Sequence, residues 1–207
     1  MAASTTDLEI AQRACVMVGI SPIPAFVPTP PTAEAQFVNE IFESTVQAEL
    51  EQYPWRFAMK QTTLSLDAAA PTSRWASKYE LPTDCLMPRT VLVANYPIEY
   101  DRYENFIFAD TSSTDTLVLE YTFRPIVARW SSGFQMGLIE RLAGHIAIGV
   151  QERDRKSQEL NSQADVTLLK ARTADAQGQT SRGFVMDQFT GNRVGGNRRL
   201  VTRSNTT

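Results

Sequence analysis

The spacing of apolar residues changes twice along this chain, and no other feature constrains its fold as strongly. Up to about residue 55, apolar residues recur three and four positions apart, as they do on one face of a helix. From "WRFAMKQTTLSL" to "TLVLEYTFR" they alternate with polar residues, and turn clusters such as "DTSSTDT" separate the short runs. The helical spacing returns after residue 130. Strands joined by connections this short pair antiparallel, so the sequence predicts an α+β fold.

The expected architecture is a bundle of about four helices, two N-terminal and two C-terminal, with a central antiparallel β insertion and an extended C-terminal tail. We assign residues 1–55 and 131–176 to the helical bundle. Residues 56–130 form the β insertion, for which we expect a small sheet and a projecting hairpin. Residues 177–207 form a C-terminal docking tail.

Local signals place the ends of the first helix. Thr6 and Glu9 have the spacing of a capping box, and Gly19 is a natural stop. Five prolines follow between Pro22 and Pro31, and so many prolines exclude both a helix and a central strand. We therefore expect a stiff, extended connector there.

The other helices are read in the same way. Thr32 is expected to cap a helix over residues 33–52, and Ser131 or Ser132 is expected to cap the third helix. The apolar residues at helical spacing are Phe37, Ile41, Phe42, Val46, Leu50 and Tyr53 in the second helix, Phe134, Leu138, Leu142, Ile146 and Val150 in the third, and Leu160, Ala164, Leu168 and Ala171 in the fourth.

The sequence holds few groups of the kind that catalysis requires. His145 is the only histidine, which excludes a metal site built from histidines, and the spacings typical of phosphate-binding loops and serine nucleophiles are absent. We interpret His145 as a core or interface residue, and Cys15 and Cys85 as core thiols in a reduced, cytoplasmic setting. With 23 acidic residues, some carboxylates must lie close together by chance. We expect no catalytic residue, no metal and no cofactor.

Neither a membrane segment nor a secretory signal is expected. The longest apolar stretch, "LAGHIAIGV", is far shorter than the ~20 residues that a membrane helix needs. The opening "MAASTTDLEI" has neither the basic start nor the apolar centre of a signal peptide.

Charge is distributed unevenly along the chain. Residues 176–207 contain five arginines and one acid, a net charge of +4, while the whole chain carries −3. The first 175 residues therefore carry −7. A basic tail on an acidic body is expected to meet an acidic partner, either nucleic acid or the acidic body of a neighbouring subunit.

Four stretches occur in an order that is familiar from one family. They are "AQRACVMVGISPI", "ELEQYPWRFAMKQTTLSL", "WASKYELPTDCLMPRTVLV" and the closing tail. Together they resemble the head-to-tail adaptor proteins of short-tailed bacteriophages, the tail tubular protein A family. The residues that match the family's corner and strand patterns are Pro54, Trp55, Phe57 and Ala58, and Tyr79, Leu81, Pro82, Asp84 and Cys85.

The resemblance implies a structural role in the virion, at the junction of head and tail, for a protein made in the host cytoplasm. Adaptors of this family form a ring, usually of twelve subunits, below the portal protein. Their helical part and C-terminal segment engage the portal, and their β part faces the tail nozzle, which is similar to tail tubular protein B. Genomic DNA passes through the channel without specific binding. No cofactor and no membrane are implied.

Two features of the residues agree with a ring. The small residues of "AGHIAIG" would allow a close lateral contact with a neighbouring subunit. An acidic lumen would repel phosphate and let DNA slide, which is a prediction about where the acidic residues face.

The tail is the candidate portal-docking site. Thirty extended residues reach about 100 Å, whereas a body of 175 residues has a radius of gyration of about 16 Å. Apolar anchors would offset the entropy lost on binding, and arginines would pair with carboxylates. The expected docking residues are Phe184, Val185, Met186, Phe189, Arg193, Arg198 and Arg199.

Other interpretations stay open. The tail could be a terminus without a role, or a DNA-binding arm whose affinity would fall with a slope of about −4.5 in log K against log salt. The whole protein could instead be an adaptor-like virion protein with peptidoglycan hydrolase activity, or a generic intracellular binding module. We expect a structural protein and not an enzyme.

Overall fold

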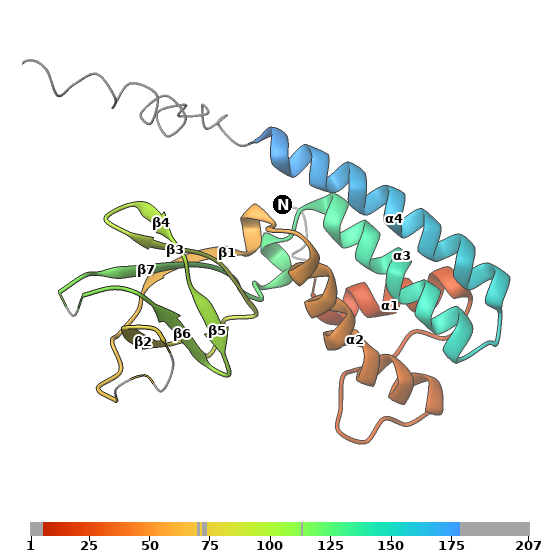
Figure 1. Ribbon diagram of the computed structural model, residues 1–207. Coiled ribbons are helices and arrows are strands. Elements are labelled where there is room, and N and C mark those ends of the chain that lie inside the picture. The colour runs from red at the N-terminus through yellow and green to blue at the C-terminus, as the bar shows by residue number, and fades with distance from the viewer. Residues whose placement is uncertain (1–5, 70, 72–73, 113, 179–207) are drawn as a thin grey trace, which may run out of the picture. The chain divides into compact units, whose positions relative to one another are not determined.

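The computed structural model describes residues 6–69, 71, 74–112 and 114–178, and its fold is α+β, as the sequence predicted (Figure 1). Residues 1–175 form one compact unit that contains both the helical bundle and the β insertion, and a second unit begins at residue 176. The part of the chain that the structure describes has the α-helices α1 (Asp7–Val18), α2 (Ala33–Gln52), α3 (Ser132–Gly149) and α4 (Asp154–Gln177).

The predicted caps of the first three helices are confirmed. The Thr6 hydroxyl accepts from the Glu9 amide, and the Glu9 carboxylate accepts from the Thr6 amide, so the capping box is complete. Gly19 ends α1 at φ 85°, a left-handed conformation that glycine adopts without a steric penalty. Thr32 caps α2 through the Ala35 amide, and α3 is capped by Ser131, not Ser132.

The buried side of α2 is rotated from the predicted stripe. Phe37 and Ile41 are only half-buried, while Val38 is fully buried. The core stripe runs instead through Val38, Phe42, Val46 and Leu50, four residues apart at each step. The sequence was ambiguous here because apolar residues stand side by side at positions 37–38 and 41–42.

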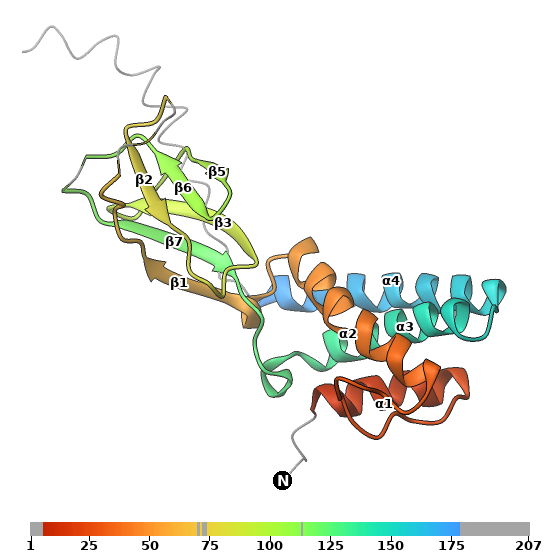
Figure 2. The same cartoon turned by 90° about the horizontal axis from the view of Figure 1, so that it is seen from below.

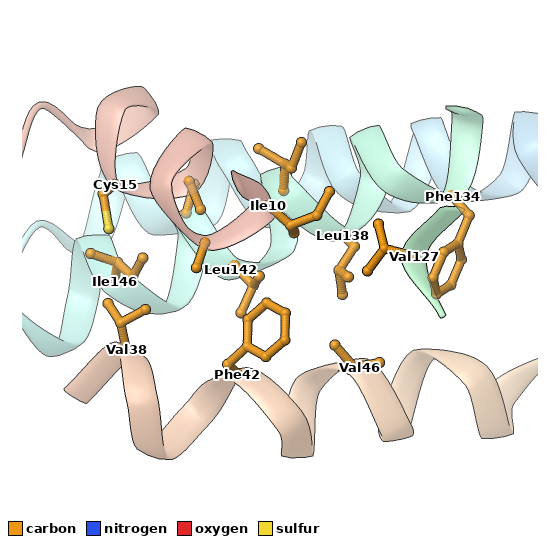
Figure 3. Close-up of a cluster of buried hydrophobic side chains, with 14 of the residues drawn as sticks. Ile10, Cys15, Val38, Phe42, Val46, Val127, Phe134, Leu138, Leu142 and Ile146 are labelled. Carbon is orange, nitrogen blue, oxygen red and sulfur yellow. The ribbon is translucent and has the colours of Figure 1, made fainter. Parts of the chain in front are cut away.

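Three helices supply most of the bundle core. Figure 3 shows side chains of α1, α2 and α3 pointing toward one another, and the predicted stripe of α3 is buried except for Val150. The ten labelled members are Ile10, Cys15, Val38, Phe42, Val46, Val127, Phe134, Leu138, Leu142 and Ile146.

Helix α4 packs against α3 through small residues, and the two helices lie side by side in both views (Figures 1 and 2). A Cβ atom added at Gly133 would lie 2.8 Å from Cβ of Ala171, and one added at Gly137 would lie 2.6 Å from Cγ of Leu168. The glycines thus permit an approach that any larger residue would prevent. The predicted stripe of α4 is buried at all four positions, Leu160, Ala164, Leu168 and Ala171.

The β insertion contains two antiparallel sheets instead of the predicted single sheet and hairpin. The first has the strand order β1-β7-β3-β4 and the second the order β2-β6-β5. Within the described residues the strands are β1 (Met59–Thr63), β2 (Ser77–Glu80), β3 (Met87–Val93), β4 (Tyr96–Ile98), β5 (Asp101–Tyr103), β6 (Phe106–Ala109) and β7 (Leu117–Thr122).

Trp75, Ser77, Tyr79 and Leu81 alternate along "WASKYELP" and so share one face, and all four are buried. Strands β4 and β5 escaped the sequence analysis because three residues are too few to show an alternating pattern. Strand β1 begins later than expected, since Arg56–Ala58 forms a single 3₁₀ turn.

Two arginines connect the β insertion to the helices. Arg124, just after β7, donates to Glu43 of α2 at 2.7 Å and to Asp7 of α1 at 2.9 Å. Arg89 of β3 donates to the carbonyl of Glu51 at 2.7 Å and so satisfies a carbonyl at the C-terminal end of α2. These contacts stabilise the chain at the two places where it passes between its helical part and its β insertion.

None of the helices in the described part of the chain is long and apolar enough to span a bilayer.

Candidate functional site

The residues that carry the family resemblance form the corner between α2 and β1. Trp55 is fully buried, and its Nε1 donates to the carbonyl of Glu49 at 3.0 Å. Its ring lies 5.0 Å from that of Phe134 and 5.7 Å from that of Phe57. Pro54 stands between the end of α2 and this indole. The corner is therefore a packed aromatic joint.

Asp84 holds the first sheet to the loop before β3. Its carboxylate accepts from Nζ of Lys60 at 2.8 Å and from the hydroxyl of Tyr121 at 2.9 Å. The hydrogen bond from Lys60 is the largest cause that lowers the pKa of Asp84, so the carboxylate is ionised at neutral pH.

The other matched strand residues also have structural contacts. The hydroxyl of Tyr79 lies 2.7 Å from that of Thr111, and Leu81 is buried in the core of the β insertion. The carbonyl of Pro82 accepts from the amide of Cys85 at 3.0 Å, which closes the turn before β3. The matched residues thus build the scaffold and do not converge on one site.

The proposed portal-docking residues lie outside the described residues. They are Phe184, Val185, Met186, Phe189, Arg193, Arg198 and Arg199. Helix α4 extends to Gln177, one residue beyond the predicted end of the bundle.

A groove between α2, α3 and α4 is a cavity that a ligand could enter. Its volume is about 660 Å³, within the range of ~300–1,000 Å³ found for ligand pockets. It is open to solvent along exposed residues such as Ala48 and Ile148. The lining residues are Phe37, Ile41, Ser44, Thr45, Ala48, Glu49, Gln52, Arg141, His145, Ile148 and Asp165.

An ion-pair network around the buried Glu49 forms one wall of this groove. Nε of Arg141 donates to Oε1 of Glu49 at 2.9 Å, and the same guanidinium donates to Asp165 and to Asn161. Glu49 is 2% exposed, and its Oε2 accepts no hydrogen bond among the described residues. The cation beside Oε2 is Arg172, whose Nη2 lies 3.9 Å away.

His145 also lines the groove, half-buried on α3. Burial is the main cause that lowers the pKa of His145, and the nearby charge of Arg141 lowers it further. The imidazole is therefore neutral at pH 7 and adds no charge to the groove.

The glycines of α3 serve packing within the chain. A Cβ atom at Gly144 would lie 2.8 Å from Oδ1 of Asn161, and one at Gly149 would collide with the ring of Phe37. The small residues of "AGHIAIG" thus admit α4 and α2 of the same chain. They do not supply the support for a lateral subunit contact that the sequence suggested.

The described residues include no group of three or more His, Cys, Asp or Glu side chains placed to hold a metal ion. Cys15 is buried and Cys85 is half-buried, and both are free thiols. Burial raises the pKa of Cys15, and it raises that of Cys85 to about 11. Neither sulfur is thus a thiolate at neutral pH, which makes both poor nucleophiles.

Sequence analysis missed the groove and its ion pairs. The one available signal was Glu49, which stands three residues after Val46 and seven after Phe42, within the core stripe of α2. A glutamate in such a position requires a buried cation, but the sequence does not say which of the arginines supplies it.

No protein-family model matches the chain, and no curated protein matches its sequence.

Proposed function

We propose that this chain is a head-to-tail adaptor of a short-tailed bacteriophage, a structural virion protein that forms a ring between the portal and the tail nozzle. The C-terminal tail docks on the portal, and the ring is a conduit for DNA. The protein is not an enzyme and needs no cofactor.

One observation carries this proposal: four stretches that resemble the tail tubular protein A family follow one another in the family's order. The α+β architecture supports it, because a β insertion between two helix pairs is what the resemblance implies. The packed corner at Trp55 and the salt bridge of Asp84 give the matched residues scaffold roles, which any member with this architecture would need.

The distribution of charge supports the roles proposed for the acidic body and for the basic tail. Residues 1–55 and 131–175 contain thirteen acidic and seven basic residues, a net charge of −6, whereas residues 56–130 carry −1. The acidity of the body therefore lies almost entirely in the helical part. An acidic surface facing DNA would keep the duplex from adhering, and the basic tail would need an acidic partner elsewhere.

Binding to the portal tests the proposal. Portal rings encoded by the same genome would be mixed with the full-length chain, with a variant in which Phe184, Met186 and Phe189 are serine, and with a control in which Gln188, Thr190 and Asn192 are alanine. We expect the wild-type chain and the control to co-sediment with portals and the serine variant to stay in the supernatant. Equal binding by all three would contradict portal docking by the tail.

A peptidoglycan zymogram addresses the enzymatic alternative. We expect no clearing from the purified protein at any pH. Clearing that persists after repurification would replace the structural proposal by that of an adaptor-like hydrolase.

A further inference from the structure

We propose that the end of α4 is a latch that couples the C-terminal tail to the corner between α2 and β1. The latch consists of Arg172 and Asp175 with the corner residues that they contact, Gln52, Tyr53, Trp55 and Arg56. It lies within the described residues and needs no partner. Only the identity of the tail's partner, the portal, rests on the proposed function.

Asp175 supplies a cap that the corner lacks. The 3₁₀ turn Arg56–Ala58 follows Trp55, whose side chain makes no capping hydrogen bond. Oδ2 of Asp175 accepts from the amide of Arg56 at 3.1 Å, although the two residues are 119 positions apart. A carboxylate in this place satisfies an amide that has no partner inside the turn. The end of α4 therefore stabilises the start of the β insertion.

Arg172 contacts the corner about one turn earlier in α4. Its Nη2 donates to Oε1 of Gln52, the last residue of α2, at 3.0 Å. Its backbone carbonyl accepts from the hydroxyl of Tyr53 at 3.4 Å. Its Cζ lies 5.9 Å from the centroid of the Tyr53 ring and 6.0 Å from that of Trp55, within the range of a cation–π interaction. Arg172 thus touches both the end of α2 and the aromatic joint.

The place of Asp175 in α4 is unfavourable without this contact. Asp175 stands two residues before Gln177, where α4 ends. A negative charge in the last turn of a helix opposes the helix dipole. The hydrogen bond to Arg56 compensates for this repulsion, so the latch stabilises the end of α4 as well as the corner.

The latch lies in a part of α4 that opens readily. Ala171 is the last buried residue of the helix, and the residues after it that make no latch contact, Thr173, Ala174, Ala176 and Gln177, are exposed. Helix ends fray because their last carbonyls have no partner in the helix, and segments with few buried apolar contacts open locally. When the last turn opens, Asp175 leaves Arg56 and the corner loses its cap.

The tail begins at Gln177, two residues after Asp175. A partner that holds the tail also restricts the fraying of the last turn and so keeps Asp175 on Arg56. The coupling is reciprocal, because two events that depend on one local opening stabilise each other equally. A closed latch therefore reduces the ordering that docking requires, and docking on the portal stabilises the corner from which the β insertion starts.

Hydrogen exchange of the Arg56 amide, followed by NMR in the free full-length chain, tests the latch without a portal. Ala176→Gly weakens the last turn at an exposed position, and Ser162→Gly is the matched control at an exposed position within the same helix. Exchange is expressed relative to the amide of the buried Leu142. We expect it to be at least twofold faster than in the wild type in Ala176→Gly and unchanged in Ser162→Gly. Unchanged exchange in both variants, or an equal increase in both, would overturn the latch.

Asp175→Ala separates the latch from the intrinsic stability of the helix. Alanine is the better helix former and removes a charge that opposes the dipole, so the last turn by itself is favoured. The latch nevertheless requires the Arg56 amide to exchange at least twofold faster in Asp175→Ala. Glu159→Ala, which removes an acid from the exposed surface of α4, should leave this amide unchanged. An Arg56 amide that is as protected in Asp175→Ala as in the wild type would refute the cap.

Portal binding tests the coupling to the docked tail. Asp175→Ala should weaken the binding of the full-length chain to portal rings at least threefold, although every docking residue is unchanged, whereas Glu159→Ala should bind as the wild type does. Equal binding by the two variants would contradict the coupling. If the wild-type chain itself fails to bind, the proposed function is wrong, and the exchange of Arg56 in Ala176→Gly still decides whether the last turn of α4 and the corner are coupled.

Discussion

Oε1 of Glu49 lies 2.9 Å from Nε of Arg141, and this buried ion pair joins α2 to α3. Arg141 also reaches Asp165 of α4, so one guanidinium connects three helices of the bundle. Burying charge is unfavourable unless the partners satisfy one another, and removing one partner leaves the others buried without compensation.

Glu49→Ala is therefore expected to lower the free energy of unfolding by about 3–5 kcal/mol, as measured by urea titration. Glu159→Ala is the matched control, because Glu159 pairs with Arg155 on the exposed surface of α4. The Glu159→Ala substitution is expected to change the free energy of unfolding by less than about 0.5 kcal/mol. Similar effects for the two variants would show that the Glu49 pair contributes no more than a surface pair does.

His145 is expected to make stability depend on pH. Its pKa is lowered in the folded chain, mainly by burial, so the unfolded chain takes up a proton first as the pH falls below the ordinary value of 6.5. The unfolded state then binds more protons, and the free energy of unfolding decreases through this window, down to the folded pKa. Because His145 is the only histidine, its imidazole NMR signals report that pKa directly.

The matching variant is His145→Gln, which should flatten the dependence of stability on pH between about 7 and the folded pKa. An imidazole that titrates at or above 6.5 in the folded protein would contradict the burial of His145 between α2 and α3.

The close packing of α3 on α4 predicts that Gly137→Ala is destabilising. Alanine in a helix is favourable over glycine by about 1 kcal/mol, but its Cβ would lie 2.6 Å from Cγ of the buried Leu168. Overpacking typically costs about 1–3 kcal/mol, so we expect the free energy of unfolding, measured by urea titration, to fall by up to about 2 kcal/mol. Ser162→Ala, at an exposed position of α4, should change stability by less than about 0.5 kcal/mol. A stabilised Gly137→Ala variant would mean that the helices lie farther apart.

The hairpin between β3 and β4 carries a strained turn. Ala94 and Asn95 have φ values of 48° and 67°, a left-handed conformation that alanine adopts at a cost of about 1–2 kcal/mol. Replacing the pair by Asn-Gly, which this turn type favours, should raise the free energy of unfolding by about 1 kcal/mol. By contrast, Ala174→Gly in α4 should lower it by about 1 kcal/mol. Thermal unfolding distinguishes the two expectations, because the melting temperature should rise in the Asn-Gly variant and fall in Ala174→Gly.

Local signals in the sequence were sufficient for the helices and their caps. The hydroxyls of Thr6 and Thr32 bond to amides three residues away, so the relevant partners are visible in the sequence itself. The exposed and buried sides of β2 followed from alternation for the same reason.

The features that depend on distant partners were not predictable in this way. The ion pair of Glu49 with Arg141 joins residues 92 positions apart, and the pairing of β5 with β6 involves three residues without an apolar pattern. The role of the glycines in α3 was assigned to the wrong neighbour, because a small residue shows that something lies close but not what it is. The candidate docking residues from Phe184 to Arg199 lie outside the described residues, and their role stays a prediction.

Electron microscopy of the full-length chain bound to portal rings tests the central claim most directly. The account predicts a closed ring of about twelve copies on one end of each portal, with an open channel at its centre. Portals that remain bare, or that bind scattered copies without forming a ring, would contradict the proposal that this chain is a head-to-tail adaptor.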